Sequence, residues 1–218
     1  MIAQMELDKA LSMMDIEWSK QDDLSDVRSM FIYTAKTVEE CIQKCKKYHI
    51  DNVNYILHRW YNFQTSEICE ELFEKYGAVR EKKRNHRLID IYVNGVPFDV
   101  KLTAYPRALK NKTLDLDNQE DRDFLIQWFY TNQSQASRRH FANRLFIVCE
   151  DTSVYNNMKL KGNIPLLEKE ISKYMKYKKY YPHKLKIKTD DGEVEVCSDI
   201  IVIRGDQNDS TRTNYNVS

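Results

Sequence analysis

The dipeptide Asn94-Gly95 is the feature that most constrains how this chain can fold. Apolar residues alternate with other residues on both sides of it, in the stretch RLIDIYVNGVPFDVKLT from Arg87 to Thr103. Asn and Gly tolerate the positive φ that a two-residue type I′ turn needs at both central positions, and such a turn fixes which residues face each other. The stretch therefore predicts a β-hairpin of defined register.

This register decides which side chains share a face of the hairpin. Three apolar pairs lie opposite each other and are expected to point into the core: Val93 with Val96, Ile91 with Phe98, and Ile89 with Val100. The other face then has Asp90 directly opposite Asp99, with Lys101 two residues further along. Because like charges directly opposite each other destabilise a sheet, selection for stability alone would avoid this pairing.

A divalent cation would turn the repulsion between these two aspartates into attraction. Carboxylates from neighbouring strands can bind one Mg²⁺ ion, whose remaining positions are filled by water or phosphate oxygens. The ammonium group of Lys101 would then orient an attacking water or stabilise charge on a phosphoryl group. Such a site is typical of phosphodiester hydrolysis. The alternative is a solvated face on which a D-x-K triplet arose by chance.

The rest of the chain predicts an α/β fold, with a mixed central sheet flanked by helices. At 218 residues and 42% hydrophobic, it is long enough for one substantial core. Helical spacing and capping residues predict helices over 38–48, from 53 or 65 to 76, from Asp117 or Asn118 to 133, and over 164–181. Strands are predicted at 30–35 and 144–151, and a second hairpin at 184–189 with 193–204.

The chain is expected to form one core with additions at both ends. We predict an N-terminal extension over 1–55 that packs on the core, a core domain over 56–204, and a disordered polar tail over 205–218. The acidic N-terminus is unlike a secretory signal, and no apolar run approaches the roughly 18 residues of a membrane span. We therefore expect a soluble, cytoplasmic protein that does not bind a membrane.

Composition argues against several other chemistries. The five cysteines are odd in number and include no C-x-x-C pair, which favours reduced thiols. Cys41, Cys45 and His49 would span about 12 Å along one helix, too far to share one zinc ion, so core cysteines are expected. With only five glycines there is no phosphate-cradling loop, and we expect no nucleotide cofactor.

The hairpin resembles the active-site region of the PD-(D/E)XK nuclease superfamily, which has the restriction-endonuclease-like fold. Its motif is an acidic residue on one strand and D/E-x-K on the next, here Asp90 and Asp99-Val100-Lys101. The preceding segment SEICEELFEKYG is similar to the glutamate-bearing helix of archaeal Holliday-junction resolvases and related small nucleases. The resemblance covers 66–103. It departs from the motif at Ile89, where proline is the eponymous residue, and at Asp99, where glutamate is more usual.

The resemblance implies an αβββαβ core with accessory helices and a site for Mg²⁺, for which Mn²⁺ would substitute. Asp90, Asp99, Glu67 and the backbone carbonyl of Val100 would bind the metal, and Lys101 would position the water that attacks. Glu71 is the alternative to Glu67, because it lies four residues further on, on the same face of the helix.

A metal-dependent DNA endonuclease is thus the expected function, in restriction or phage defence. Cleavage of a duplex needs two sites, so we expect a homodimer. The alternatives are a Holliday-junction resolvase, a DNA-repair nuclease, or a nucleic-acid-binding protein of the same fold without activity.

Basic residues mark possible contacts with DNA, although the net charge of +1 does not indicate a polyanion partner by itself. The stretch 169–188 interleaves lysines with tyrosines, which could contact phosphates and stack on bases, or form a solvated face beside core tyrosines. The candidate nucleic-acid-binding residues are Arg107, Arg138, Arg139, Lys176, Lys178 and Lys179.

Overall fold

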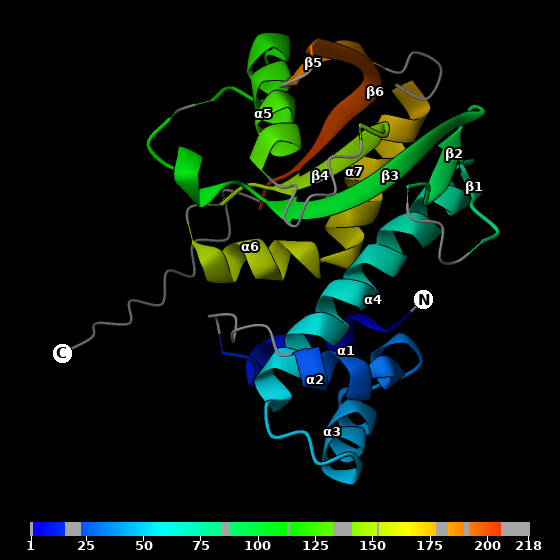
Figure 1. Cartoon of the computed structure of the whole chain (residues 1–218), viewed down its shortest axis with the longest axis vertical. Coiled ribbons are helices and arrows are strands. Elements are labelled where there is room, and N and C mark those ends of the chain that lie inside the picture. The colour runs from blue at the N-terminus through cyan, green and yellow to red at the C-terminus, as the bar shows by residue number, and fades with distance from the viewer. Residues whose placement is uncertain are drawn as a thin grey trace.

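The fold is α/β, with a six-stranded mixed sheet between two layers of helices, as the sequence predicts (Figure 1). The computed structural model describes residues 2–15, 23–83, 88–112, 114–132, 141–151, 153–177, 183–189 and 192–205. The strands are β1 (Val79–Arg80), β2 (Ile91–Val93), β3 (Val96–Ala104), β4 (Arg144–Cys149), β5 (Lys184–Thr189) and β6 (Gly192–Ile203). Their order in the sheet is β1-β2-β3-β4-β6-β5. β4 runs parallel to β3 and β6, and the other neighbours are antiparallel.

The helices frame this sheet and extend beyond it. They are α1 (Gln4–Met13), α2 (Asp23–Arg28), α3 (Val38–Lys47), α4 (Val53–Lys75), α5 (Gln119–Asn132), α6 (Val154–Lys161) and α7 (Ile164–Tyr177), with short 3₁₀ helices η1 (Met30–Tyr33) and η2 (Arg107–Leu109). From α4 to β4 the order is helix, three strands, helix, strand. This is the αβββαβ order expected of the core.

Two hydrophobic clusters hold the layers together. Phe146 and Val148 of β4 pack with Phe129 of α5 on one face of the sheet. Leu145 and Ile147 point to the other face, where α4, α6 and α7 lie (Figure 1). All four β4 residues are fully buried, which explains the continuous apolar run in this strand.

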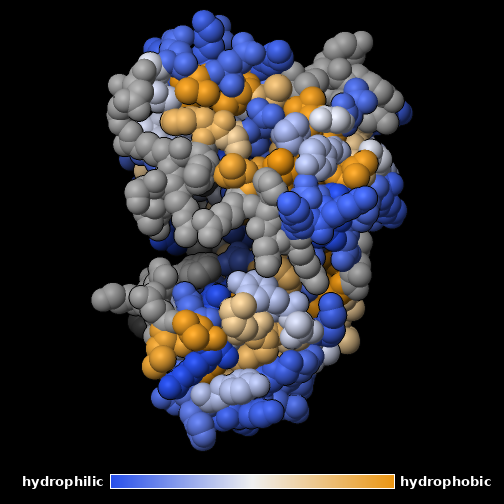
Figure 2. All heavy atoms as spheres, turned by 45° about the vertical axis from the view of Figure 1, so that its right-hand side comes forward, coloured by the Kyte–Doolittle hydropathy of each residue, from blue (hydrophilic) through white to orange (hydrophobic). Residues whose placement is uncertain are grey.

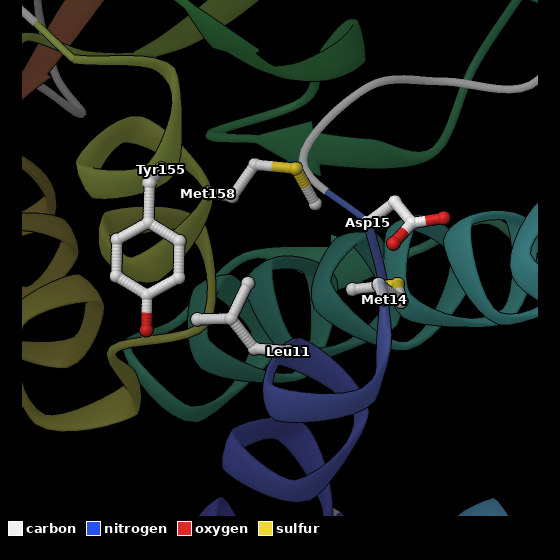
Figure 3. Close-up of a pocket in the computed structure, with 5 residues that line it drawn as sticks. All are labelled: Leu11, Met14, Asp15, Tyr155 and Met158. Carbon is white, nitrogen blue, oxygen red and sulfur yellow. The ribbon is translucent and has the colours of Figure 1, made fainter. Parts of the chain in front are cut away.

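The N-terminal helices α1 to α3 pack around the first half of α4, away from the sheet (Figure 1). In Figure 2 the waist between the two parts is a recess, and hydrophilic residues gather at both ends of the molecule. Where α1 meets α6, Met14 and Met158 line a pocket of about 10 Å³ (Figure 3). Such a volume holds about one water, so this pocket is a packing gap rather than a ligand site.

Local signals in the sequence explain most helix ends. The Thr37 hydroxyl accepts a hydrogen bond from the amide of Glu40 at 3.1 Å and so caps α3. Asn118 accepts the amide of Glu120 at the start of α5, and Gly77, with φ of 100°, follows the end of α4. The helix expected from 53 or 65 begins at Val53.

The helices α1 and α2 and the strand β1 were not predicted individually, and two further elements differ from the prediction. The strand expected over 30–35 is wrong, because Met30–Tyr33 form the 3₁₀ helix η1, which buries Phe31 and Ile32 between helices. Helix α6 was not predicted, since its sequence VYNNMKLK has no clear apolar period. The end of the last helix at Pro182 and the tail after Gly205 lie outside the described residues, and the predicted domain boundaries stay a prediction.

Two further expectations can be compared with the structure. All five cysteines are free thiols, and Cys41 and Cys45 are fully buried in the core, where burial raises the pKa of Cys41 to about 12. Across the segments that the structure describes, no helix combines the length and the apolar character that a membrane crossing requires.

Candidate active site

The hairpin turn has the conformation that its sequence predicts. Asn94 and Gly95 have φ of 51° and 84°, and Val93 pairs with Val96 and Ile91 with Phe98. Ile91, Val93 and Phe98 are buried in the same cluster. The predicted register is therefore confirmed from the turn to Ile91.

Beyond Ile91, the first strand leaves the ladder and places Asp90 at the edge of β3. The amide of Asp90 donates to the carbonyl of Phe98 at 2.9 Å, and β2 begins only at the next residue. The Asp90 carboxylate then accepts the amide of Val100 at 2.7 Å. The side chain of Asp90 thus replaces a neighbouring strand at this point, and the pairing of Ile89 with Val100 is not part of the ladder.

The two aspartates meet as predicted, although they come from an irregular rather than a regular pairing. Burial is the main cause that raises the pKa of Asp90 to about 6, and both the charge of Asp99 and a hydrogen bond to its side chain raise this pKa further. The Val100 amide and the charge of Lys101 act in the opposite direction. Two carboxyl groups in contact repel each other when both are ionised, so a proton or a cation stabilises the pair.

Asp99 is buried more deeply than Asp90, and its carboxylate contacts two cationic side chains. Its residue is only 7% exposed. One oxygen forms an ion pair with the ammonium of Lys101, whose side chain is 46% exposed, and the other lies 3.3 Å from Nε of Arg144. Arg144 is the neighbour of Asp99 in the parallel pairing of β3 with β4, and its guanidinium lies 4.9 Å from the ring centroid of Tyr130.

The backbone of Val100 faces the same edge as Asp90. The amides of Asp99 and Tyr105 bond to β4 and its flanking residue Asn143. Because successive residues of a strand direct their amide and carbonyl to opposite sides, those of Val100 point away from β4, toward Asp90. The carbonyl predicted as a metal ligand is therefore on the correct side of the strand.

Two glutamates of α4 are linked to β1 by an arginine that the sequence analysis did not identify. The C-terminal half of α4 lies beside β1 and β2 (Figure 1), and Arg80 of β1 binds Glu67 at 3.2 Å and Glu70 at 2.5 Å. Burial raises the pKa of Glu70 to about 7, and the charge of Asp90 adds to this rise. Glu70 is thus a further acidic residue near Asp90, and the proposed roles of Glu67 and Glu71 stay predictions.

Asp90 and Asp99 supply the type of ligand that Mg²⁺ prefers, and both oxygens of Asp99 contact the cationic groups of Lys101 and Arg144. Magnesium usually takes one or two carboxylates and fills its octahedron with water and substrate phosphates. Within the described ranges, no group of three or more His, Cys, Asp or Glu side chains is arranged to hold a metal. The groups that could hold Mg²⁺ here are the two carboxylates and the Val100 carbonyl, while the Glu70 carboxylate is paired with Arg80.

The basic residues predicted to contact DNA are placed only in part. Arg107 is exposed in η2, after the end of β3, and Lys176 is exposed near the end of α7 with its ammonium 5.1 Å from the ring of Tyr177. Of the tyrosines in α7, Tyr174 packs against the core, which agrees with a structural role, whereas Tyr177 is exposed, as a contact with nucleic acid would require. Arg138, Arg139, Lys178 and Lys179 lie outside the described residues.

A cleft of about 520 Å³ lies away from the carboxylates, between α7 and the end of β6. Two of the cations that line it already have acidic partners. Arg122 pairs with buried Asp199 at 2.6 Å, and Arg204 pairs with Asp117 and Glu150. Size alone would favour this cleft, but Asp99 of β3 and the adjoining Asp90 carry the more specific chemistry.

No family model, curated protein or solved structure matches the chain. What can be said of the site therefore depends on its own geometry.

Proposed function

We propose that this chain is a metal-dependent nuclease that hydrolyses phosphodiester bonds in DNA. The observation that supports this most strongly is the contact of Asp90 with Asp99 at the edge of β3, with Lys101 paired to Asp99. A purely structural sheet has no use for two adjoining carboxylates, whereas a cation that binds phosphate needs them. The order αβββαβ around the site agrees with the resemblance to PD-(D/E)XK nucleases.

Each residue has a role that follows from its position. Asp90 and Asp99, with the carbonyl of Val100, would hold Mg²⁺, which activates water and neutralises charge on the phosphate when bound. Lys101 is half exposed, so its ammonium can turn from Asp99 to hold the attacking water and the phosphate oxygens. The attacking water gives up a proton to solvent as its oxygen bonds to phosphorus, the bond from phosphorus to one sugar oxygen breaks, and the departing oxygen takes up a proton from solvent. Arg144 is a positioning residue, because it fixes the buried side of Asp99.

The test is cleavage by the purified protein. Supercoiled plasmid, linear duplex, single strands and branched DNA would each be incubated with Mg²⁺, Mn²⁺ or EDTA. We expect cleavage that depends on the metal, and a loss of at least about 100-fold in Asp99→Asn and in Lys101→Ala, the range over which positioned catalytic groups act. The set of DNA forms distinguishes a duplex endonuclease from a junction-specific enzyme.

A matched control guards against loss through general charge effects. Glu193→Gln and Lys186→Ala change an exposed carboxylate and lysine that form an ion pair at 3.6 Å elsewhere in the sheet, between β6 and β5. These variants should cut as well as the unmodified protein. The proposal is wrong if no DNA is cut under any condition, or if Asp99→Asn retains the full rate while circular dichroism shows it to be folded.

A further inference from the structure

Within the described residues, the edge of β3 beyond Asp90 has no neighbouring strand. β2 pairs with β3 only over Val96–Phe98, and in the described part of the chain β3 pairs with β4 alone from Asp99 to Ala104. The backbone groups of Leu102 point to the same side as those of Val100, because both alternate with residues that bond to β4. An unpaired amide here is a donor for an anionic group that lies along the edge.

A basic segment begins where this edge ends. Arg107, Lys110 and Lys112 follow β3 within eight residues, and all three are exposed. The segment folds back onto the sheet, since Leu109 packs against the hydrophobic cluster between α5 and the sheet, which includes Phe129 and is called the α5 cluster. In addition, the Tyr105 hydroxyl donates to the Lys112 carbonyl at 3.3 Å. Its three cations are therefore carried on an ordered support.

The three cations of this segment differ in their contacts from the paired arginines of the cleft beside α7. Among the described residues none of the three cations forms an ion pair, and Lys112 instead lies 3.4 Å from the ring centroid of Phe124. The nearest acidic residues in sequence have other contacts: Asp117 binds Arg204 at 3.0 Å, and Asp115 accepts the amide of Asp117. This distinguishes the segment from the cleft beside α7, where Arg122 and Arg204 are paired.

We propose that the open edge of β3 and the basic segment Arg107–Lys112 form a track that holds the DNA backbone on one side of the bond to be cut. The track rests on the proposed function for its direction, because the scissile phosphate would lie at Asp90 and Asp99. β3 ends at Ala104 and η2 begins at Arg107, so the chain from Lys101 to Arg107 spans at most about 20 Å. One strand of a duplex rises 3.4 Å per nucleotide, so the basic segment would contact phosphates up to about six nucleotides from the cut.

The test compares two triple variants that remove the same charge. The first is Arg107→Ala with Lys110→Ala and Lys112→Ala. The second, a control, is Lys184→Ala with Lys186→Ala and Lys188→Ala, which lie on β5 at the opposite end of the sheet. Binding of a fluorescent duplex would be measured in EDTA, so that nothing is cut, over a range of salt concentrations.

We expect the first triple to bind at least about 10-fold more weakly at low salt, and its salt slope to fall by up to about 2.7, because each lost phosphate contact removes about 0.9. The control should stay within about twofold of the unmodified protein. Equal losses in both triples, or no loss in the first, would overturn the track. Duplexes that end before the basic segment should be cleaved equally well by the first triple variant and the unmodified protein. If the first triple variant still cleaved these shorter duplexes less well, that would also contradict the track.

These results separate the two proposals. If the first triple binds more weakly but the unmodified protein cuts no DNA with Mg²⁺ or Mn²⁺, the track stands as a binding surface and the nuclease proposal fails. If the protein cuts DNA and the first triple binds and cuts equally well, only the track fails.

Discussion

At the scale of single residues, Asp99 is the side chain whose surroundings are most closely specified. It is buried and accepts contacts from Lys101 on its own strand and Arg144 on the next. A buried charge that loses a partner is destabilising, because the remaining partner is left uncompensated. The site is thus held by the same ion pairs that support the proposed chemistry.

Replacement of Arg144 should therefore reveal this coupling. We expect Arg144→Met to lower the free energy of unfolding by about 2 kcal/mol, less than for a fully isolated pair because Lys101 remains. Adding Asp99→Asn should restore part of that loss, since the uncompensated carboxylate is removed. Urea unfolding of both single variants and the double variant measures the coupling. Simple addition of the two single effects would contradict the assigned ion pair.

His58 predicts a pH dependence outside the candidate site. It is fully buried in α4, its Nε2 lies 2.7 Å from the carbonyl of Asp15, and burial lowers its pKa. Below about pH 6.5, His58 therefore binds a proton more readily in the unfolded chain than in the folded chain. The free energy of unfolding thus falls as the pH drops from 7 to 5, by at most about 1.4 kcal/mol per pH unit. The difference in stability between the unmodified protein and His58→Gln should change over this range. A constant difference would show that His58 titrates alike in both states.

The sequence could predict Asp90, Asp99 and Lys101 as a group because a two-residue turn relates them locally. Glu70, Arg80 and Arg144 could not be found in the same way. Arg144 reaches Asp99 only because β3 and β4 pair in parallel. These two strands are far apart in the sequence, with α5 between them. The place of Glu70 depends on how α4 packs beside β1, which its repeated glutamates do not reveal.

At the scale of elements, the turn between β2 and β3 sets the register that brings the aspartates together. Gly95 has φ of 84°, and a Cβ there would meet no atom within 4 Å. Gly95→Ala should thus cost about 1–2 kcal/mol through backbone conformation alone. Gly205→Ala, whose Cβ would have an ordinary 3.7 Å contact with Leu160, is the control and should change stability by less than about 0.5 kcal/mol. Equal midpoints of thermal unfolding for the two variants would contradict the assigned turn.

Elements with a local signal were predicted best. The capped helix α3, the Asn-Gly hairpin and the apolar strand β4 each contain their own cause. The error at η1 has the opposite origin, because the short apolar run MFIYTA suits a strand as well as a buried turn of helix. Its neighbours α2, α3 and α4 decide which of the two forms, and that information is tertiary.

At the scale of the whole molecule, α4 connects the N-terminal helices to the sheet. Its first half packs with α1 and α3, and its second half reaches β1 and β3. One hydrophobic cluster extends from Leu7 in α1 to Ile203 in β6. Although the outline suggests two parts, this continuous core favours one cooperative unit.

Two tryptophans on different elements can test that cooperativity. Trp60 is fully buried in α4, and Trp128 packs against the α5 cluster beside Phe129. Variants that retain one of these two, with Trp18 and the other replaced by Phe, would report on each part separately. We expect their urea midpoints, corrected for the stability of each variant by circular dichroism, to coincide, because unfolding the N-terminal helices would expose the α4 face that also covers the sheet. A midpoint for Trp60 clearly below that for Trp128 would instead show that residues 1–55 unfold as a separate extension, and would place the boundary of the core within α4.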